Sequence, residues 1–185
     1  MFAYCSSLAS VPEFDTSSVT NMESMFYKCS ALTSVPLFDT SSVTNMSKMF
    51  YSCSSLTTIP LIDTSKVTSM QYMFGYCSSL TSIPLLDTSS VTEMYNMFYN
   101  CSKLTTVGGF KDLGKAFTSS TTISLWKSLP LSSESVTNIA NTVYDMNQNT
   151  SIQSATISFP KTVYAALTDE QKATFAAKNW TVKSL

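Results

Sequence analysis

The sequence predicts an α/β solenoid built from stacked 24-residue units, with short strands and short helical turns and with an α/β cap at the C-terminal end. The motif Met-Phe-x-x-Cys occurs five times at intervals of 24 residues, and a repeat of about 20 to 50 residues is typical of a solenoid. After residue 110 the repeat stops, and separate helix and strand patterns follow. We therefore expect residues 1–110 to form the solenoid (four full repeats and part of a fifth), and residues 111–185 to cap it.

The aligned columns of the repeat predict the core, because each unit must bury its apolar side against its neighbours. The columns that hold in all copies are Cys5, Cys29, Cys53, Cys77 and Cys101; Leu8, Leu32, Leu56, Leu80 and Leu104; and Val11, Val35, Ile59, Ile83 and Val107. Other columns hold in the first copies: Pro12, Pro36, Pro60 and Pro84; Asp15, Asp39, Asp63 and Asp87; Val19, Val43, Val67 and Val91; and Met22, Met46, Met70 and Met94. The array ends in the fifth copy, where Gly108, Gly109 and Lys111 replace Pro, Leu and Asp.

Each unit is expected to contain a short helical turn and a brief strand. The helical turn is predicted because four apolar residues have the i, i+3, i+4, i+7 spacing of one helical face: Met46, Met49, Phe50 and Cys53. Residues 32–38 are rich in Thr and β-branched side chains and are expected to form a strand closed by Pro36. A second extended piece should follow at residues 43–46, after an Asp-Thr-Ser turn.

The C-terminal segment has its own helix and strand signals. Apolar residues from Val136 to Tyr144 predict an amphipathic helix with Ser132 as its N-cap. Alternating apolar residues predict a strand at 155–159, and a last short strand is expected at 180–182. Thr168 and Gln171 form a capping box, which predicts a helix ending near Asn179.

The composition excludes several classes of function. With a net charge of −1, the chain is too neutral for an electrostatic nucleic-acid binder. The sequence has no His and no Arg, which excludes a His base, a His metal ligand and an Arg clamp. No apolar stretch is long enough for a membrane span, and no signal peptide begins the chain. We expect either a piece of a longer exported array or delivery by another route, such as a phage particle.

Two columns of the repeat raise the question of disulfides and metals. An odd number of Cys, one per unit, favours buried free thiols over disulfides or a metal site. The Asp column is interpreted as turn-forming, through bonds from each carboxylate to backbone N–H groups two residues on. A row of calcium sites is the alternative, but no Gly-rich loop with several carboxylates accompanies these residues. We expect no cofactor and no metal.

Tyrosines next to the core Phe of each unit are the candidate binding residues. Tyr27, Tyr51 and Tyr99 occupy equivalent positions. Aromatic rows on a rigid scaffold can form a protein- or sugar-binding stripe. The alternative is that the rings pack as partly buried rims of the core.

The stretch M-F-x-x-C-S-x-L-x-S-(V/I)-P, continued by D-T-S-x-V-T-x-M, resembles the BspA-type leucine-rich-repeat family of bacterial surface proteins, over roughly residues 1–110. The resemblance implies a leucine-rich-repeat-like fold and an exported, non-catalytic adhesion module that binds host or bacterial surface proteins or glycans. A phage tail or receptor-binding component is the alternative. A hydrolase using carboxylates is a distant one, because Asp112, Asp145, Asp169 and Glu170 have no spacing that favours catalysis. We expect a monomer that is extracellular or at the cell surface, with a phage virion as the alternative location.

Overall fold

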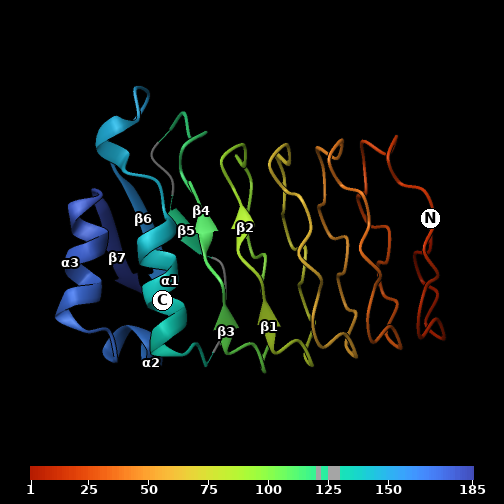
Figure 1. Cartoon of the computed structure of the whole chain (residues 1–185). Coiled ribbons are helices and arrows are strands. Elements are labelled where there is room, and N and C mark those ends of the chain that lie inside the picture. The colour runs from red at the N-terminus through yellow and green to blue at the C-terminus, as the bar shows by residue number, and fades with distance from the viewer. Residues whose placement is uncertain (120–121, 125–129) are drawn as a thin grey trace.

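The repeat units lie side by side in sequence order and form a stack (Figure 1). The computed structural model describes residues 1–119, 122–124 and 130–185. We call each 24-residue turn of the chain a coil, numbered 1 to 5 from Met1. Parallel bridges join Asn21 to Asn45, Asn45 to Ser69, and Ser69 to Glu93, each one coil further along. The stack is therefore held by backbone bonds between equivalent residues of neighbouring coils.

Strands occur in the last two coils and are two residues long. Coil 4 carries β1 (Ser82–Ile83) and β2 (Leu86–Asp87), which pair in parallel with β3 (Thr106–Val107) and β4 (Phe110–Lys111) of coil 5. The strand expected at residues 32–38 is absent from coil 2. A Pro in the middle of this segment has no N–H to donate, so each coil has only short runs on either side that can pair.

The predicted helical turn is wrong, although its apolar face is buried as expected. The amides of Met49, Tyr51 and Cys53 bond to carbonyls three residues earlier, at 3.0 to 3.2 Å, and no helix is present in this segment. The amide of Phe50 instead donates to Met73 of the next coil at 2.9 Å. Lys48 has a positive φ of 56°, a left-handed conformation that interrupts a right-handed helix. Alternate amides thus point along the stack, and the bonds between coils replace helical bonds.

Ladders of identical side chains form the core of the stack. The Phe rings of coils 2 to 5 lie nearly parallel, with centroids 5.6 to 5.7 Å apart, and each is fully buried: Phe26, Phe50, Phe74 and Phe98. A buried Thr column lies beside the Asp column, and each Thr hydroxyl donates to a carbonyl of the next coil at 2.7 to 2.9 Å: Thr16, Thr40, Thr64 and Thr88. Buried hydroxyls are therefore satisfied by the neighbouring coil.

Among its described residues, the C-terminal segment forms three α-helices, a short 3-10 helix and a parallel sheet of order β5-β6-β7. Its elements are β5 (Thr122–Ser124), α1 (Ser133–Thr142), η1 (Met146–Gln148), β6 (Ala155–Phe159), α2 (Lys161–Ala165), α3 (Asp169–Ala177) and β7 (Trp180–Ser184). The N-cap at Ser132, the strand β6 and the capping box of Thr168 with Gln171 are confirmed. Helix α1 ends at Thr142 rather than Tyr144, and α2 and η1 were not predicted. No helix in the described part of the chain is long and apolar enough to cross a membrane.

Helix α1 lies against the last coil and bonds to its open edge (Figure 1). The Ser135 hydroxyl accepts from the amide of Val107 and donates to the carbonyl of Thr105, both at 2.9 Å. The Thr142 hydroxyl accepts from the amide of Phe110 at 2.8 Å. Side chains of α1 thus satisfy backbone groups that a following coil would otherwise satisfy.

Candidate functional site: a tyrosine groove

The three tyrosines predicted as binding residues line one open groove of about 500 Å³, which we call the tyrosine groove. Its lining residues are Tyr27, Lys48, Tyr51, Tyr72, Tyr76, Tyr95, Asn96 and Tyr99. They come from equivalent turns in successive coils, where residues with a positive φ bend the backbone sharply. Equivalent turns in neighbouring coils therefore place tyrosines from distant parts of the sequence side by side.

The rings form a continuous row, although the repeat is broken in the middle. Tyr27 and Tyr51 stack with centroids 5.0 Å apart and planes 7° from parallel. At the next equivalent position stands Gly75, where a Cβ would lie only 2.9 Å from the Tyr51 ring. Tyr76, one residue further on, continues the row, with its ring centroid 5.3 Å from the centroids of both Tyr51 and Tyr99. The row therefore runs through Tyr27, Tyr51, Tyr76 and Tyr99.

A second line of rings borders this row. Tyr72 meets Tyr51 edge-on at 6.0 Å, and Tyr95 meets Tyr72 edge-on at 5.5 Å. The Asn96 amide donates to the Tyr72 hydroxyl at 3.1 Å and holds that ring in place. Tyr95 is 59% exposed and Tyr76 is 38% exposed. The groove thus offers fixed aromatic surface to solvent at low further cost in side-chain entropy.

The predicted residues themselves are half-buried. Burial, together with the neighbouring hydroxyls of Tyr76 and Tyr27, raises the pKa of Tyr51 above its usual value. Its hydroxyl therefore stays protonated at neutral pH and can both donate and accept a hydrogen bond. Each of these rings packs on its neighbours and also lines the groove, and a role in binding stays a prediction.

A second groove of about 660 Å³ adjoins the first, because Tyr76 lines both. Its other lining residues are Lys28, Ser30, Ser52, Ser54, Ser78, Asn100 and Ser102. Lys28 also lies over two rings, with its ammonium 5.3 Å from the Tyr4 centroid and 5.4 Å from the Tyr27 centroid. Hydroxyls, an amide and one cation therefore extend the aromatic surface on this side.

The Cys column consists of free thiols, but only four of the five are buried. Each buried Sγ donates to the carbonyl of a Phe in the preceding coil at 2.9 to 3.1 Å: Cys29, Cys53, Cys77 and Cys101. Burial raises the pKa of Cys53 and of Cys101 to about 12, which makes both poor nucleophiles. The expected burial is wrong for Cys5, which lies in coil 1, on the side that no other coil of this chain covers.

Alkylation of the native protein should therefore modify Cys5 quickly and the other four thiols only after denaturant is added. Intact-mass spectrometry is expected to show a single adduct in native buffer and five adducts in denaturant. A Cys5→Ser variant provides the control and should show no rapid adduct. Rapid native labelling of two or more thiols would contradict the buried thiol ladder.

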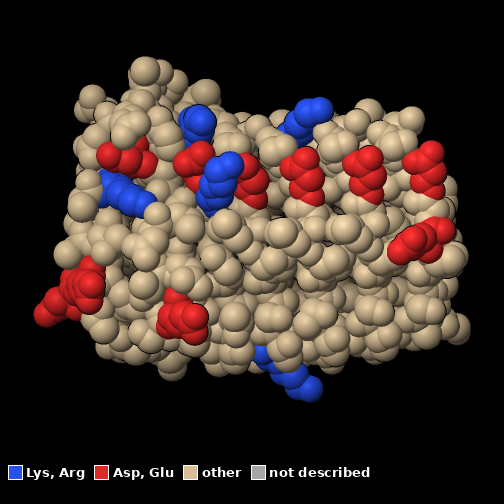
Figure 2. All heavy atoms as spheres, in the orientation of Figure 1, with Lys and Arg blue, Asp and Glu red and all other residues tan. Residues whose placement is uncertain are grey.

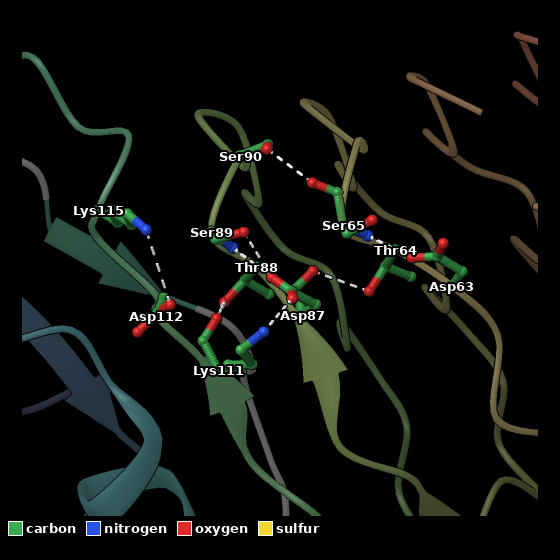
Figure 3. Close-up of polar contacts among 10 residues, drawn as sticks. All are labelled: Asp63, Thr64, Ser65, Asp87, Thr88, Ser89, Ser90, Lys111, Asp112 and Lys115. Atoms are coloured by element: carbon green, nitrogen blue, oxygen red, sulfur yellow. Dashed lines mark hydrogen bonds and ion pairs between the residues drawn. The ribbon is translucent and has the colours of Figure 1, made fainter. Parts of the chain in front are cut away.

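The Asp column forms turns, as predicted (Figure 3). In each of coils 1 to 4, one carboxylate oxygen accepts from the amide of the Ser two residues on, at 2.9 to 3.0 Å: Asp15, Asp39, Asp63 and Asp87. Hydrogen bonds from the Ser side chain and then from the Ser amide lower the pKa of Asp15 and of Asp39. Lys111 takes the Asp position in coil 5, and its ammonium lies 2.7 Å from Asp87. Among the described residues, no group of three or more His, Cys, Asp or Glu side chains could hold a metal ion.

A family model described as "Mycoplasma protein of unknown function, DUF285" matches residues 1–110 and 63–183. The two overlapping matches include both the coils and the C-terminal segment. The chain belongs to this family. DUF285 is a BspA-like repeat family of unknown function, so the sequence resemblance holds at that coarser level. No curated protein and no solved structure matches the chain significantly.

In this DUF285 protein, three of the four carboxylates considered for a hydrolase have a partner within the same short segment. Asp112 lies 4.0 Å from Lys115, and Asp169 lies 3.7 Å from Lys172. Asp145 caps η1 by accepting from the amide of Asn147. Glu170, in the first turn of α3, is the one carboxylate among the residues that line a small pocket of about 210 Å³ between α1 and α3.

Proposed function

We propose that this protein is a non-catalytic recognition module, a leucine-rich-repeat-like solenoid that binds its ligand along the tyrosine groove. The observation that carries this proposal is the gathering of six tyrosines in one open groove on a stack of backbone-bonded coils. Tyrosine supplies large, rigid contact area together with a polar tip, which is why it is frequent in binding surfaces. The rigid stack keeps the rings in place before the ligand arrives.

The lining chemistry favours a ligand that is uncharged or acidic. The charged residues that line the two grooves are Lys48 and Lys28, and the remaining lining residues are Tyr, Ser and Asn. Aromatic faces beside hydroxyl and amide groups suit a glycan or a tyrosine- and amide-rich protein segment. We propose a protein or glycan of a host or bacterial surface as the ligand, and display outside the cell or on a phage particle as the setting.

Several observations support binding rather than catalysis. The sequence has no His to act as a general base. The buried thiols have raised pKa values and bond to backbone carbonyls. Packing accounts for the repeated geometry of the coils, and these features do not require a catalytic nucleophile with its base.

Binding should depend on the tyrosines of the groove. The purified chain is first tested against immobilised host matrix proteins, mucin glycans and whole bacterial cells. Tyr27→Ala, Tyr51→Ala and Tyr99→Ala are each expected to weaken binding of the retained bait by about 1 to 2 kcal/mol, or roughly 5- to 30-fold, because each removes an aromatic anchor. Tyr95→Ala should also weaken binding and should cost little stability, since that ring is 59% exposed.

Tyr164→Ala is the matched control, because Tyr164 is a half-buried tyrosine of α2 outside the groove. It should leave binding unchanged. Retention of none of the three baits, or an equal loss of binding in Tyr164→Ala and Tyr95→Ala, would contradict recognition through the groove.

A further inference from the structure

A stripe of exposed leucines runs along the stack on a segment that does not contribute to the tyrosine groove. Leu37, Leu61 and Leu85 occupy one position in three successive coils and are 65%, 67% and 41% exposed. Each follows a Pro, and each precedes a buried core residue. Single exposed leucines need no explanation, but three at one position in adjacent coils make a contiguous apolar patch.

A row of carboxylates runs parallel to this leucine stripe. Asp39 and Asp63 lie two residues after Leu37 and Leu61, and the intervening residue is buried, so each leucine and its aspartate face solvent on the same side. Figure 2 shows the carboxylates as a straight row on the face that carries β1 to β4 in Figure 1. Successive coils are about 4.8 Å apart where their backbones pair. Neighbouring leucines of the stripe and neighbouring aspartates of the row are therefore separated by the same distance, which is the spacing between coils.

The row carries net negative charge that is only partly neutralised. Within the described residues, no ion pair involves Asp15, Asp39 or Asp63. Hydrogen bonds from the Ser65 amide and side chain lower the pKa of Asp63, and the charge of nearby Lys66 adds a smaller contribution. Glu13 adds a further carboxylate at the leucine position of coil 1. A partner that covers the leucines would thus bring the residues beside its apolar surface close to the carboxylates. Lys or Arg is favoured at those positions of the partner.

We propose that this face binds a basic amphipathic helix of a protein partner, lying along the stack. An α-helix rises about 5.4 Å per turn, close to the spacing of about 4.8 Å between coils. One apolar side chain per turn can then meet each leucine, and one Lys or Arg per turn can meet each aspartate. An extended strand repeats its same-side residues about every 6.6 Å and loses this register within two coils.

Coil 5 marks the end of the binding face. Gly109 replaces the leucine, and Lys111 replaces the aspartate and pairs with Asp87 (Figure 3). A cationic helix would gain no apolar contact there and would meet a like charge. The apolar contacts of the helix are therefore confined to coils 2 to 4, which carry the leucines, and its acidic contacts to coils 1 to 4, which carry the aspartates.

The test uses a synthetic helical peptide of Leu and Lys, about 18 residues long, with Leu at i, i+3, i+4 and i+7. Fluorescence anisotropy with the full chain is expected to show saturable binding that weakens at high salt. A peptide with Glu in place of Lys, and a scrambled Leu and Lys peptide, should bind at least about 10-fold more weakly. Failure of the Leu and Lys peptide to bind, or equal binding of its scrambled form, would overturn the proposal.

Variants of the protein locate the binding. Leu61→Ser removes an exposed side chain and should lower the affinity about 5-fold or more without changing the fold. Asp39→Asn keeps an oxygen that can accept the turn bond, removes the charge, and should lower both the affinity and its dependence on salt. The matched control is Asp145→Asn, because Asp145 makes the same kind of turn outside the row. Unchanged binding in Leu61→Ser and Asp39→Asn, or an equal loss in Asp145→Asn, would overturn the proposed face.

Discussion

A fragment of residues 1–110 is expected to aggregate under conditions in which the full chain stays in solution as a monomer. The last coil buries Leu104, Val107 and Phe110 completely, and α1 packs against β3 and β4 of this coil. Without residues 111–185 these side chains face water as one patch beside unpaired strand groups. Such an edge is a template for association with another chain. Size-exclusion chromatography with light scattering measures the result.

A point substitution in the full chain tests the same interface without deleting a segment. Ser135→Ala leaves the buried amide of Val107 without its acceptor, which should lower the free energy of unfolding by about 1 to 3 kcal/mol. Thr162→Ala is the control, because Thr162 is an exposed residue of α2 and its substitution should have a small effect. A soluble, monomeric 1–110 fragment with the melting temperature of the full chain would show that the C-terminal segment is an independent domain.

Phe74→Ala should lower the free energy of unfolding by about 3 to 5 kcal/mol, because it removes a large side chain from the middle of the Phe ladder. Phe74 is fully buried and stacks on Phe50 and Phe98 at 5.6 and 5.7 Å. Coils contact only their nearest neighbours, so a cavity here weakens both adjoining interfaces. Denaturant unfolding followed by tyrosine fluorescence and circular dichroism measures the loss.

The equivalent ring in coil 1 provides the comparison. Phe2 is half-buried and stacks on one ring of the ladder, Phe26, at 5.5 Å. Phe2→Ala should therefore cost clearly less than Phe74→Ala. Equal losses at the two positions would contradict a core whose packing depends on having a coil on both sides.

The 24-residue repeat identifies some residues of the candidate sites but not others. The equivalence of Tyr27, Tyr51 and Tyr99 follows from the 24-residue period. Tyr76 joins their row only because Gly75 leaves space beside Tyr51, a steric relation between neighbouring coils. The leucine stripe was also present as a column, but apolar columns of a repeat are ordinarily core, and only the folded chain distinguishes the exposed Leu61 from the buried Ile62.

The sequence by itself determined the period, the columns that form the core, the Asp turns, and the caps at Ser132 and Thr168, because these depend on local patterns or on strict repetition. Only the tertiary structure decided that the run from Met46 to Cys53 is not helical and that Cys5 is exposed. In both cases the neighbouring coil is the cause. It competes for the amides that a helix would use within one unit, and it covers every Cys except the one in coil 1.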